Sequence, residues 1–437
     1  MWPYHPDLLA TAVPRYTSFP TAAEFGPDVG PADYSDALAT ANGDVSLYVH
    51  IPFCEKICWY CGCNTGAANR THRLTSYLDA LHREIALVAA LLPAGARVRR
   101  IAFGGGSPNA IAPVDFVRLF DQLALHFPLA SPTMSIELDP RTLSAPWGSV
   151  IAGIGITHAS LGVQTFAPAL QEAIGRVQPL CTIDRSVKLL REAGISSLNF
   201  DLMYGLPGQT MADLAATLDL TAGYGANRVA LFGYAHVPHL IQRQKRIDGS
   251  NLPGQSARFD MAAFGYNRLV DAGYEAVGFD HFALPGDPLG QAATSGRLRR
   301  NFQGFTDDDA PVVIGLGASA IGSFPTLLAQ NEKNSGRYRM MLSQGRLATV
   351  LGRARTAEDR QRGAVIEDLL CRGRARIDRE MLTGAIERLA PYVDAGLCEI
   401  EQGVLAIHHG GLPYARSIAA SFDPYRQHSQ RRFSSAV

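Results

Sequence analysis

The segment of residues 47–63, LYVHIPFCEKICWYCGC, decides how the rest of the chain is organised. It begins as an apolar, β-branched run that is typical of a strand, and it ends in a group of cysteines. Cys54, Cys58 and Cys61 are separated by three and two residues, and Cys63 follows after one more. These thiols therefore lie on one short loop, close enough to bind a single inorganic centre.

Thiolates on such a loop can hold zinc or an iron–sulfur cluster, and a C-x-x-C pair can also carry out redox reactions. Zinc sites usually combine two separated units, and the chain has no matching second unit. A cluster held by three thiolates leaves one iron open, which suits a catalytic cluster. Two alternatives stay open on the residues alone: a tetrathiolate cluster that includes Cys63, although its one-residue gap is awkward, and a zinc-stabilised structural protein.

The composition restricts the partners and the location of the protein. Lys+Arg and Asp+Glu both number 40, so the net charge gives no reason to expect a nucleic acid or an anionic membrane as partner. Seven cysteines, four of them within ten residues, do not form the framework of a secreted disulfide protein. No signal-peptide pattern opens the chain, and the longest apolar stretch, near Ile85 to Leu92, is too short to cross a bilayer. We expect a soluble, cytoplasmic protein.

Strand-like and helix-like segments alternate from about residue 45. The predicted strands are Ser46–Ile51, Arg99–Phe103, Thr133–Leu138, His158–Val163, Ser197–Met203 and Arg228–Tyr234. Apolar residues at three- and four-residue steps predict helices over Leu74–Val88, Pro113–Leu123, Ile183–Ala193, Thr210–Ala222 and Ser256–Ala272. This alternation predicts a parallel α/β sheet, either barrel-like or doubly wound.

Every predicted strand ends in a polar or glycine-rich feature, which favours a barrel. In chain order these are the cysteine loop, Gly104-Gly105-Gly106-Ser107, Glu137, Gln164, Asp201 and Tyr234-Ala235-His236. Active sites of barrels are assembled from the carboxyl ends of several strands. We therefore expect these residues to face one site.

Each of these residues also has an ordinary structural explanation. Three glycines let a backbone approach a ligand closely, but they also make a plain tight turn. Glu137 stands among strand residues, so it needs a cation or donors, either from a ligand or in an internal ion pair. Gln164 could simply cap a loop, whereas Asp201 lies in an apolar strand and needs partners such as ribose hydroxyls.

The sequence divides into three regions. Residues 1–43 are rich in Pro, Ala, Gly and Asp without long periodicity, which indicates an N-terminal arm. Residues 44–344 hold the strand–helix units and, after the last of these units, a turn-rich connector from Asp280 to Phe305. From 345 to 437 the sequence is rich in Arg, Glu and Leu, which predicts a small, mainly helical C-terminal domain.

Cys-x3-Cys-x2-Cys with Tyr60 before the last cysteine resembles the radical S-adenosylmethionine (SAM) superfamily. Gly62-Cys63-Asn64, the segment 14–22 (PRYTSFPTA), residues 201–210 and the segment 300–306 (RNFQGFT) are similar to oxygen-independent coproporphyrinogen III oxidases. The resemblance covers Pro14 to about Phe433. It implies a partial (β/α)6 radical SAM barrel over residues 44–344, with a [4Fe–4S] cluster on Cys54, Cys58 and Cys61. The open iron would chelate SAM, and Cys63 would lie nearby without binding iron.

The resemblance also implies two SAM molecules per chain. Tyr48, Tyr60, Gly105, Glu137 and Ile321 match residues that contact the SAM at the cluster. Gly106, Ser107, Gln164, Arg176, Asp201 and Ala235 match a second SAM site. By its sequence context alone, Arg176 would be an ordinary surface arginine.

The implied reaction converts coproporphyrinogen III to protoporphyrinogen IX in heme biosynthesis. A 5′-deoxyadenosyl radical from SAM would start the oxidative decarboxylation of two propionates to vinyl groups. Arg15 and Arg300 are our candidates for binding the substrate carboxylates. We expect a monomer that receives electrons from a flavodoxin or ferredoxin. The alternative within the superfamily is a heme-binding chaperone, whose members usually lack Cys63 and the Arg-Tyr-Thr-Ser arm.

Three residues depart from the family pattern, which usually has Tyr in place of Phe19 and Phe305 and Thr in place of Asp307. Losing one hydroxyl changes a hydrogen bond worth about 1 kcal/mol, which tunes affinity without changing the substrate class. Asp307 would repel a tetra-anionic substrate unless it faces solvent or pairs with Arg299 or Arg300.

Overall fold

The computed structural model describes residues 2–68 and 71–428, and a twelve-stranded sheet forms its centre. The sheet order is β16-β15-β14-β13-β1-β4-β5-β6-β7-β8-β10-β9. The strands β13 to β8 of this order are parallel to their neighbours. Their bounds are β13 Val312–Leu316, β1 Gly43–Ile51, β4 Ala96–Gly105, β5 Leu129–Leu138, β6 His158–Gln164, β7 Ser197–Tyr204 and β8 Arg228–Gly233. All six predicted strands are therefore confirmed.

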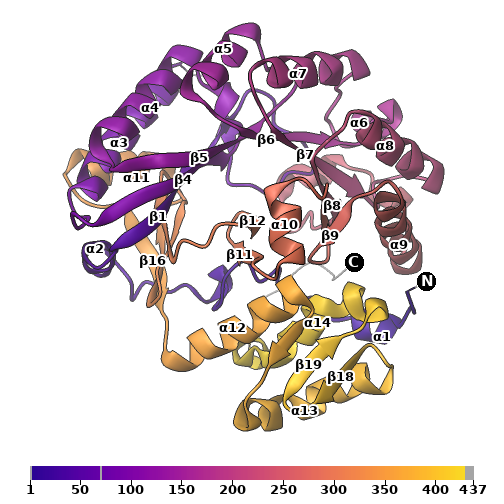
Figure 1. The fold of residues 1–437 in the computed structure, drawn as a ribbon. Helices are drawn as coiled ribbons and strands as arrows, with labels where there is room; N and C mark the ends of the chain where they lie inside the picture. Colours follow the sequence, from indigo (N-terminus) through magenta and orange to yellow (C-terminus); the bar gives the residue numbers. More distant parts are fainter. Residues whose placement is uncertain (1, 69–70, 429–437) are drawn as a thin grey trace.

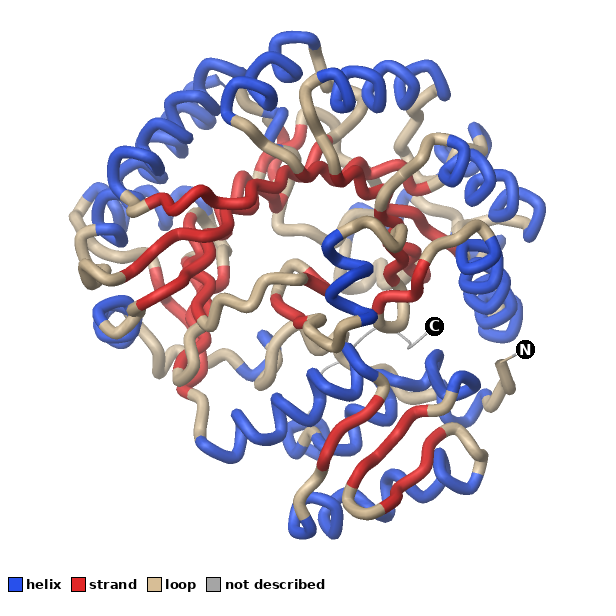
Figure 2. Tube along the Cα trace, viewed as in Figure 1, coloured by secondary structure: helices blue, strands red, loops and turns tan. Residues whose placement is uncertain are grey.

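The parallel strands form an open arc, and helices cover its outer face (Figures 1 and 2). These helices are α3 Thr71–Ala89, α4 Pro113–His126, α5 Ala145–Ile154, α6 Pro168–Ala173, α7 Leu180–Glu192, α8 Met211–Gly223 and α9 Gln255–Asp271. One or two of them follow each strand from β1 to β8, which confirms the partial (β/α)6 barrel. Sequence periodicity did not predict α5, because Gly148 and Gly153 interrupt its pattern. Burial of Trp147 against Phe116, with ring centroids 4.9 Å apart, compensates for these poor helix formers.

Antiparallel strands extend both edges of the arc. On one side lie β14 Ile321–Ser323, β15 Leu327–Asn331 and β16 Thr349–Ala354, and on the other lie β10 His281–Ala283 and β9 Glu275–Val277. The strand β16 belongs to this sheet although it follows residue 344, where we expected the C-terminal domain to begin. The turn-rich connector contains β10, α10 Pro288–Thr294 and the hairpin β11 Arg299–Asn301 with β12 Gly304–Thr306. Figure 1 shows α10 and this hairpin inside the arc.

The C-terminal segment combines helices with a small sheet. Its helices are α12 Ala357–Arg372, α13 Arg379–Asp394 and α14 Ala415–Ala419, and its antiparallel strands are β17 Arg374–Arg376, β19 Val404–Ile407 and β18 Cys398–Glu401. The remaining elements are α1 Pro6–Leu9, α2 Pro31–Ala39, α11 Ser335–Ser343, β2 Phe53–Cys54 and β3 Gly66–Ala67. No helix of the described residues is long and apolar enough to span a membrane.

The N-terminal arm is held against the C-terminal segment by hydrogen bonds. The hydroxyl of Tyr16 donates to Asp423 Oδ2 at 3.0 Å, and the hydroxyl of Tyr414 donates to the carbonyl of Pro3 at 2.8 Å. The amide of His5 in turn donates to the oxygen of Tyr414 at 2.8 Å. Because Tyr16 and Tyr414 are buried, these contacts fix the arm beside the open side of the arc.

Candidate active site

The cysteine loop follows β1, and two arginines contact the sulfur of its buried residue Cys58. Arg141 Nη2 lies 3.3 Å and Arg176 Nη1 lies 3.1 Å from Cys58 Sγ. Asp139 pairs with both arginines, at 2.6 Å from Arg141 and 3.5 Å from Arg176. We call these four residues the Cys58 wall. Two guanidinium groups therefore lie within hydrogen-bond distance of one sulfur.

The other thiols of the loop differ in their protonation. A hydrogen bond with Cys63 lowers the pKa of Cys61 to about 6, and the same bond raises the pKa of Cys63 well above its usual range. Burial, followed by the charges of Cys61 and Cys58, raises the pKa of Cys54 to about 12. The loop thus distinguishes Cys61, which ionises easily, from Cys63, which keeps its proton.

The donor set fits an iron–sulfur cluster better than a single ion. Among residues 2–68 and 71–428, no three His, Cys, Asp or Glu side chains are gathered closely enough to hold one metal ion. A [4Fe–4S] cluster takes each thiolate at a different iron, so its ligands need not converge on one point. Three cysteines on one loop, with the arginines of the Cys58 wall beside one of them, provide such a set.

The glycines at the end of β4 bring its backbone close to the cysteine loop. Gly105 has φ +107°, and a Cβ there would lie 2.3 Å from the imidazole of His50. A Cβ on Gly106 would lie 2.4 Å from the carbonyl oxygen of Phe53, directly before Cys54. Only glycine permits this approach. The amide of Gly105 donates a hydrogen bond to Glu137 Oε2 at 3.1 Å.

A hollow of about 540 Å³ lies beside the cysteine loop and contains Tyr48, Gly105 and Glu137 in its wall. The hydroxyl of Tyr48 is 3.1 Å from His50 Nδ1, and His50 Nε2 is 3.3 Å from Ser319 Oγ. Burial lowers the pKa of His50 to about 4, so the imidazole is neutral at pH 7. Burial raises the pKa of Glu137 to about 7, with further contributions from Asp201 and Cys61.

A larger cavity of about 900 Å³ opens along the carboxyl ends of β5 to β8. Five of the residues predicted to contact SAM line it: Tyr60, Glu137, Gln164, Asp201 and Ala235. Asp201 accepts hydrogen bonds from Ser160 Oγ at 2.9 Å and from Asn199 Nδ2 at 2.8 Å. Gln164 has φ +68°, which turns the chain at the end of β6. The cysteine loop and the ends of β5 to β8 thus meet in one cavity, whereas none of residues 104–107 lines it.

Other predicted site residues lie behind the cavity wall. The hydroxyl of Ser107 is buried, where it donates to Asn109 and accepts from the amide of Asp139 at 3.1 Å. Arg176 is only 7% exposed, so its interpretation as a surface arginine is wrong. Besides Cys58, it donates to the carbonyl of Gly162 at 2.9 Å. Ile321 is half-buried in β14, next to Gly315.

The two arginines proposed for substrate carboxylates have different surroundings. Arg15 lines the large cavity and lies over the ring of Phe232, 4.7 Å from its centroid. Arg300 instead holds the backbone of the arm, because its Nη2 donates to the carbonyl of Arg15 at 2.9 Å and its Nε to that of Tyr16 at 3.2 Å. Its guanidinium also covers the ring of Phe305 at 4.2 Å.

Asp307 pairs with Arg100, which replaces the expected partners Arg299 and Arg300. The two side chains form a bidentate pair at 3.0 and 2.6 Å, while Arg299 pairs with Glu367 at 2.8 Å. Arg100 belongs to β4 and lines the same cavity as Asp307. The charge of Asp307 is therefore compensated inside the cavity. Phe19 and Phe305 are both buried by packing.

Sequence reasoning missed Asp139, Arg141 and His50. The first two stand in the segment Glu137-Leu138-Asp139-Pro140-Arg141. The presence of a second carboxylate, Asp139, and a cation, Arg141, so close to Glu137 was the signal that could have identified them. His50 lies inside the opening segment, two residues after Tyr48, which places both side chains on one face of β1.

Comparisons with known proteins agree with this site. The radical SAM superfamily matches residues 48–221. The oxygen-independent coproporphyrinogen III oxidase of Bradyrhizobium diazoefficiens is 39% identical, covering 97% of this chain and 97% of its own. The protein of the same name from Escherichia coli K12 is 35% identical, covering 96% of this chain and 94% of its own.

A solved structure, the coproporphyrinogen III oxidase of Escherichia coli, is described as a radical SAM enzyme. It matches with a TM-score of 0.91 and 33% identity, over 97% of this chain and 99% of that chain. Both the sequence and the fold thus agree over almost the whole length. The chain belongs to the oxygen-independent coproporphyrinogen III oxidases of the radical SAM superfamily.

Proposed function

We propose that this protein carries out the oxygen-independent oxidative decarboxylation of coproporphyrinogen III, converting two propionates to vinyl groups to give protoporphyrinogen IX in heme biosynthesis. The observation that carries the proposal is the cavity of about 900 Å³, whose wall runs from the cysteine loop to the ends of β5 to β8. It joins a cluster-binding loop to a space large enough for an organic substrate. The relatives are named as oxidases, which gives no support to a heme-binding chaperone.

Each group of site residues receives a separate role in this proposal. Cys54, Cys58 and Cys61 hold the [4Fe–4S] cluster, and the arginines of the Cys58 wall hold the sulfur of Cys58 in place. When bound, the cluster and SAM supply the one-electron chemistry that removes hydrogen from a propionate. The residues assigned to the SAM at the cluster are Tyr48, Tyr60, Gly105, Glu137 and Ile321. Those assigned to a second SAM are Gly106, Ser107, Gln164, Arg176, Asp201 and Ala235.

The second SAM has its own test. Glu137 and Asp201 line one cavity from separate strands, and burial raises the pKa of both carboxyls. We expect SAM binding to the anaerobic holoenzyme to approach two molecules per chain by calorimetry. The variant Asp201→Asn should lose one of the two and keep its iron. A value of one SAM that Asp201→Asn leaves unchanged would reject the second site.

The electron supply and the organisation of the chain are also proposals. Glu55 and Lys56 of the cysteine loop are exposed, which leaves a surface for a flavodoxin or ferredoxin to deliver electrons. We propose that the chain works as a monomer in the cytoplasm. In it, residues 1–43 form an arm, 44–344 the catalytic domain and 345–437 a C-terminal domain. Residues 429–437 of this last region lie outside the described residues.

The activity is tested with purified, anaerobically reconstituted protein supplied with SAM, a reductant and coproporphyrinogen III. Chromatography of the oxidised porphyrins should show a monovinyl intermediate and then the divinyl product. If 5′-deoxyadenosine forms while the four-carboxylate porphyrin stays unchanged, the radical SAM chemistry stands and the substrate assignment is rejected.

A further inference from the structure

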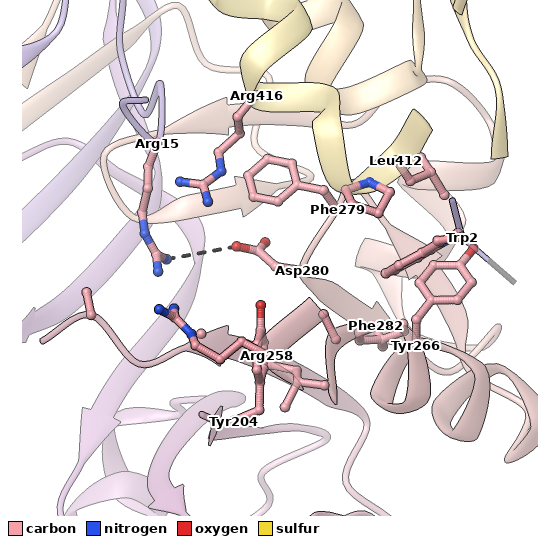
Figure 3. A pocket seen from close by; sticks show the side chains of 15 residues that line it. Trp2, Arg15, Tyr204, Arg258, Tyr266, Phe279, Asp280, Phe282, Leu412 and Arg416 are labelled. Atoms are coloured by element: carbon pink, nitrogen blue, oxygen red, sulfur yellow. Dashed lines mark ion pairs between the residues drawn. The ribbon is translucent and has the colours of Figure 1, made fainter. Parts of the chain in front are cut away.

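A small pocket of about 60 Å³ adjoins the large cavity, and three distant parts of the chain build it. The N-terminal arm contributes Trp2 and Arg15, and the C-terminal segment contributes Leu412 and Arg416. The barrel supplies the remaining lining residues, among them Tyr204, Arg258, Tyr266, Phe279, Asp280 and Phe282. Figure 3 shows the side chains of Arg15, Arg258 and Arg416 grouped around Asp280 at one end. We call this site the arginine pocket.

Positive charge exceeds negative charge in the arginine pocket. Its lining holds three guanidinium groups, those of Arg15, Arg258 and Arg416, and one carboxylate, that of Asp280. Asp280 Oδ1 is 2.7 Å from His281 Nδ1, and its Oδ2 is 3.9 Å from Arg15 Nη1. Arg258 Nε is buried and has no hydrogen-bond partner among the described residues. A buried donor without an acceptor is costly, so a carboxylate that accepts from this Nε would offset the cost.

The protonation of the lining groups agrees with this charge count. Burial lowers the pKa of Arg258, and burial together with Arg15 lowers the pKa of Arg416 to about 10. Burial opposes ionisation of Asp280, but His281 and then Arg15 hold its pKa at about 2. At pH 7 the carboxylate is therefore fully ionised and the three arginines remain positive.

The pocket opens toward the large cavity and is closed at its other end. Arg15, Gly233 and Ala235 line both spaces. A Cβ on Gly233 would lie 2.9 Å from the hydroxyl of Tyr204 and 3.3 Å from Arg258 Nη2, so the missing side chain keeps this passage open. Trp2, Tyr266 and Phe282 close the far end (Figure 3). The volume accepts a single carboxylate but excludes a macrocycle.

We propose that the arginine pocket binds one carboxylate of the substrate while the macrocycle occupies the large cavity. This assignment rests on the proposed function, since that substrate carries four carboxylates. Arg258 and Arg416 thereby join Arg15 as substrate-binding residues. Arg15 and Arg258 can both donate from guanidinium forks, which match the geometry of a carboxylate.

The test compares two arginines of the same helix, α9. The pocket variant is Arg258→Gln, and the matched control is Arg268→Gln, which removes an exposed partner of Asp219. Binding of coproporphyrin III, the stable oxidised analogue, is titrated by its absorbance in the cluster-containing enzyme. We expect Arg258→Gln to weaken binding roughly 10- to 100-fold, the effect of removing a charged donor from a carboxylate. Arg268→Gln should bind as the natural protein does.

Two further measurements identify what the pocket recognises. The tetramethyl ester of coproporphyrin III should bind the natural protein and Arg258→Gln equally, because it lacks the charge. Gly233→Ala should weaken binding of the acid although it removes no arginine. Inorganic phosphate, as a thermal-shift probe, should compete with coproporphyrin III wherever it protects the natural protein.

The outcomes separate this inference from the proposed function. Equal binding and turnover of coproporphyrinogen by Arg258→Gln and the natural protein would overturn the pocket assignment and leave the proposed function standing. Selective protection by phosphate with unchanged porphyrin binding would also overturn it, because the occupant would be a free anion. If the natural protein neither binds the porphyrin nor forms a vinyl product, both are rejected.

Discussion

The Cys58 wall and the arginine pocket both place arginines around one aspartate, but they differ in how completely these arginines are paired. In the wall, Arg141 donates to Asp139, to the carbonyl of Lys56 at 3.0 Å and to Cys58. In the pocket, Arg258 Nε has no hydrogen-bond partner among the described residues. The charged groups of the wall are paired within the protein, whereas the pocket lacks an anion beside Arg258. Similar residues thus serve structure in one place and binding in the other.

The largest effect that we expect is loss of the cluster when one of its three cysteine ligands, in or beside the wall, is removed. Cys54→Ala, Cys58→Ala and Cys61→Ala should each abolish the [4Fe–4S] cluster, because a thiolate ligand is lost. Cys63→Ala should keep it. Iron and sulfide per chain after anaerobic reconstitution provide the measurement. Equal loss of iron in Cys63→Ala would mean that the fourth thiol closes the cluster.

Arg141→Gln should destabilise the fold because it breaks the paired wall. The side chains of Arg141 and Asp139 are 6% and 7% exposed, so the variant removes a partner from a buried carboxylate. We expect a loss of about 3 kcal/mol in the free energy of unfolding. Urea unfolding of the variant against the natural protein measures it. A change below about 1 kcal/mol would show that the wall is not a tightly paired structure.

Asp280, in the arginine pocket, should make the free energy of unfolding sensitive to acid. Its pKa is about 2 in the folded protein against 3.8 in the unfolded chain, so its charge stabilises the fold above about pH 4. This contribution, about 2 kcal/mol, is lost as the pH falls from 4 toward 2. In Asp280→Asn that part of the acid dependence should disappear. The difference between the two unfolding titrations gives the value, and parallel curves would contradict it.

The smallest effect concerns the stability of the two α9 variants. Arg258→Gln removes a half-buried cation whose Nε has no hydrogen-bond partner among the described residues, so the free energy of unfolding should change by no more than about 1 kcal/mol. Arg268→Gln breaks an exposed pair with Asp219 and should likewise cost less than about 1 kcal/mol. Thermal unfolding compares them. A large loss in Arg258→Gln alone would mean that the pocket is a structural element like the wall.

Local sequence patterns predict the repeating part of this molecule well. The six predicted strands and the helices α3, α4, α7, α8 and α9 lie within a few residues of their predicted bounds. These elements have strong periodicity, which reports burial on one face of a helix or strand. The patterns did not reveal α5 or the sheet of β17, β19 and β18, because glycines interrupt the first and the strands of the second are only three or four residues long.

By itself, the sequence determined the cysteine loop, the barrel units and the polar residues at the strand ends, because each is written in a short stretch. Only the tertiary structure decided which charges meet. Arg176 reaches Cys58 across 118 positions, Arg100 reaches Asp307 across 207, and residues 15, 258 and 416 converge on one pocket. Such contacts depend on the order of the strands and on the closure of the arc by both termini. Neither the strand order nor this closure produces a periodic pattern in the sequence, because residues that meet across the fold can stand in any local sequence context.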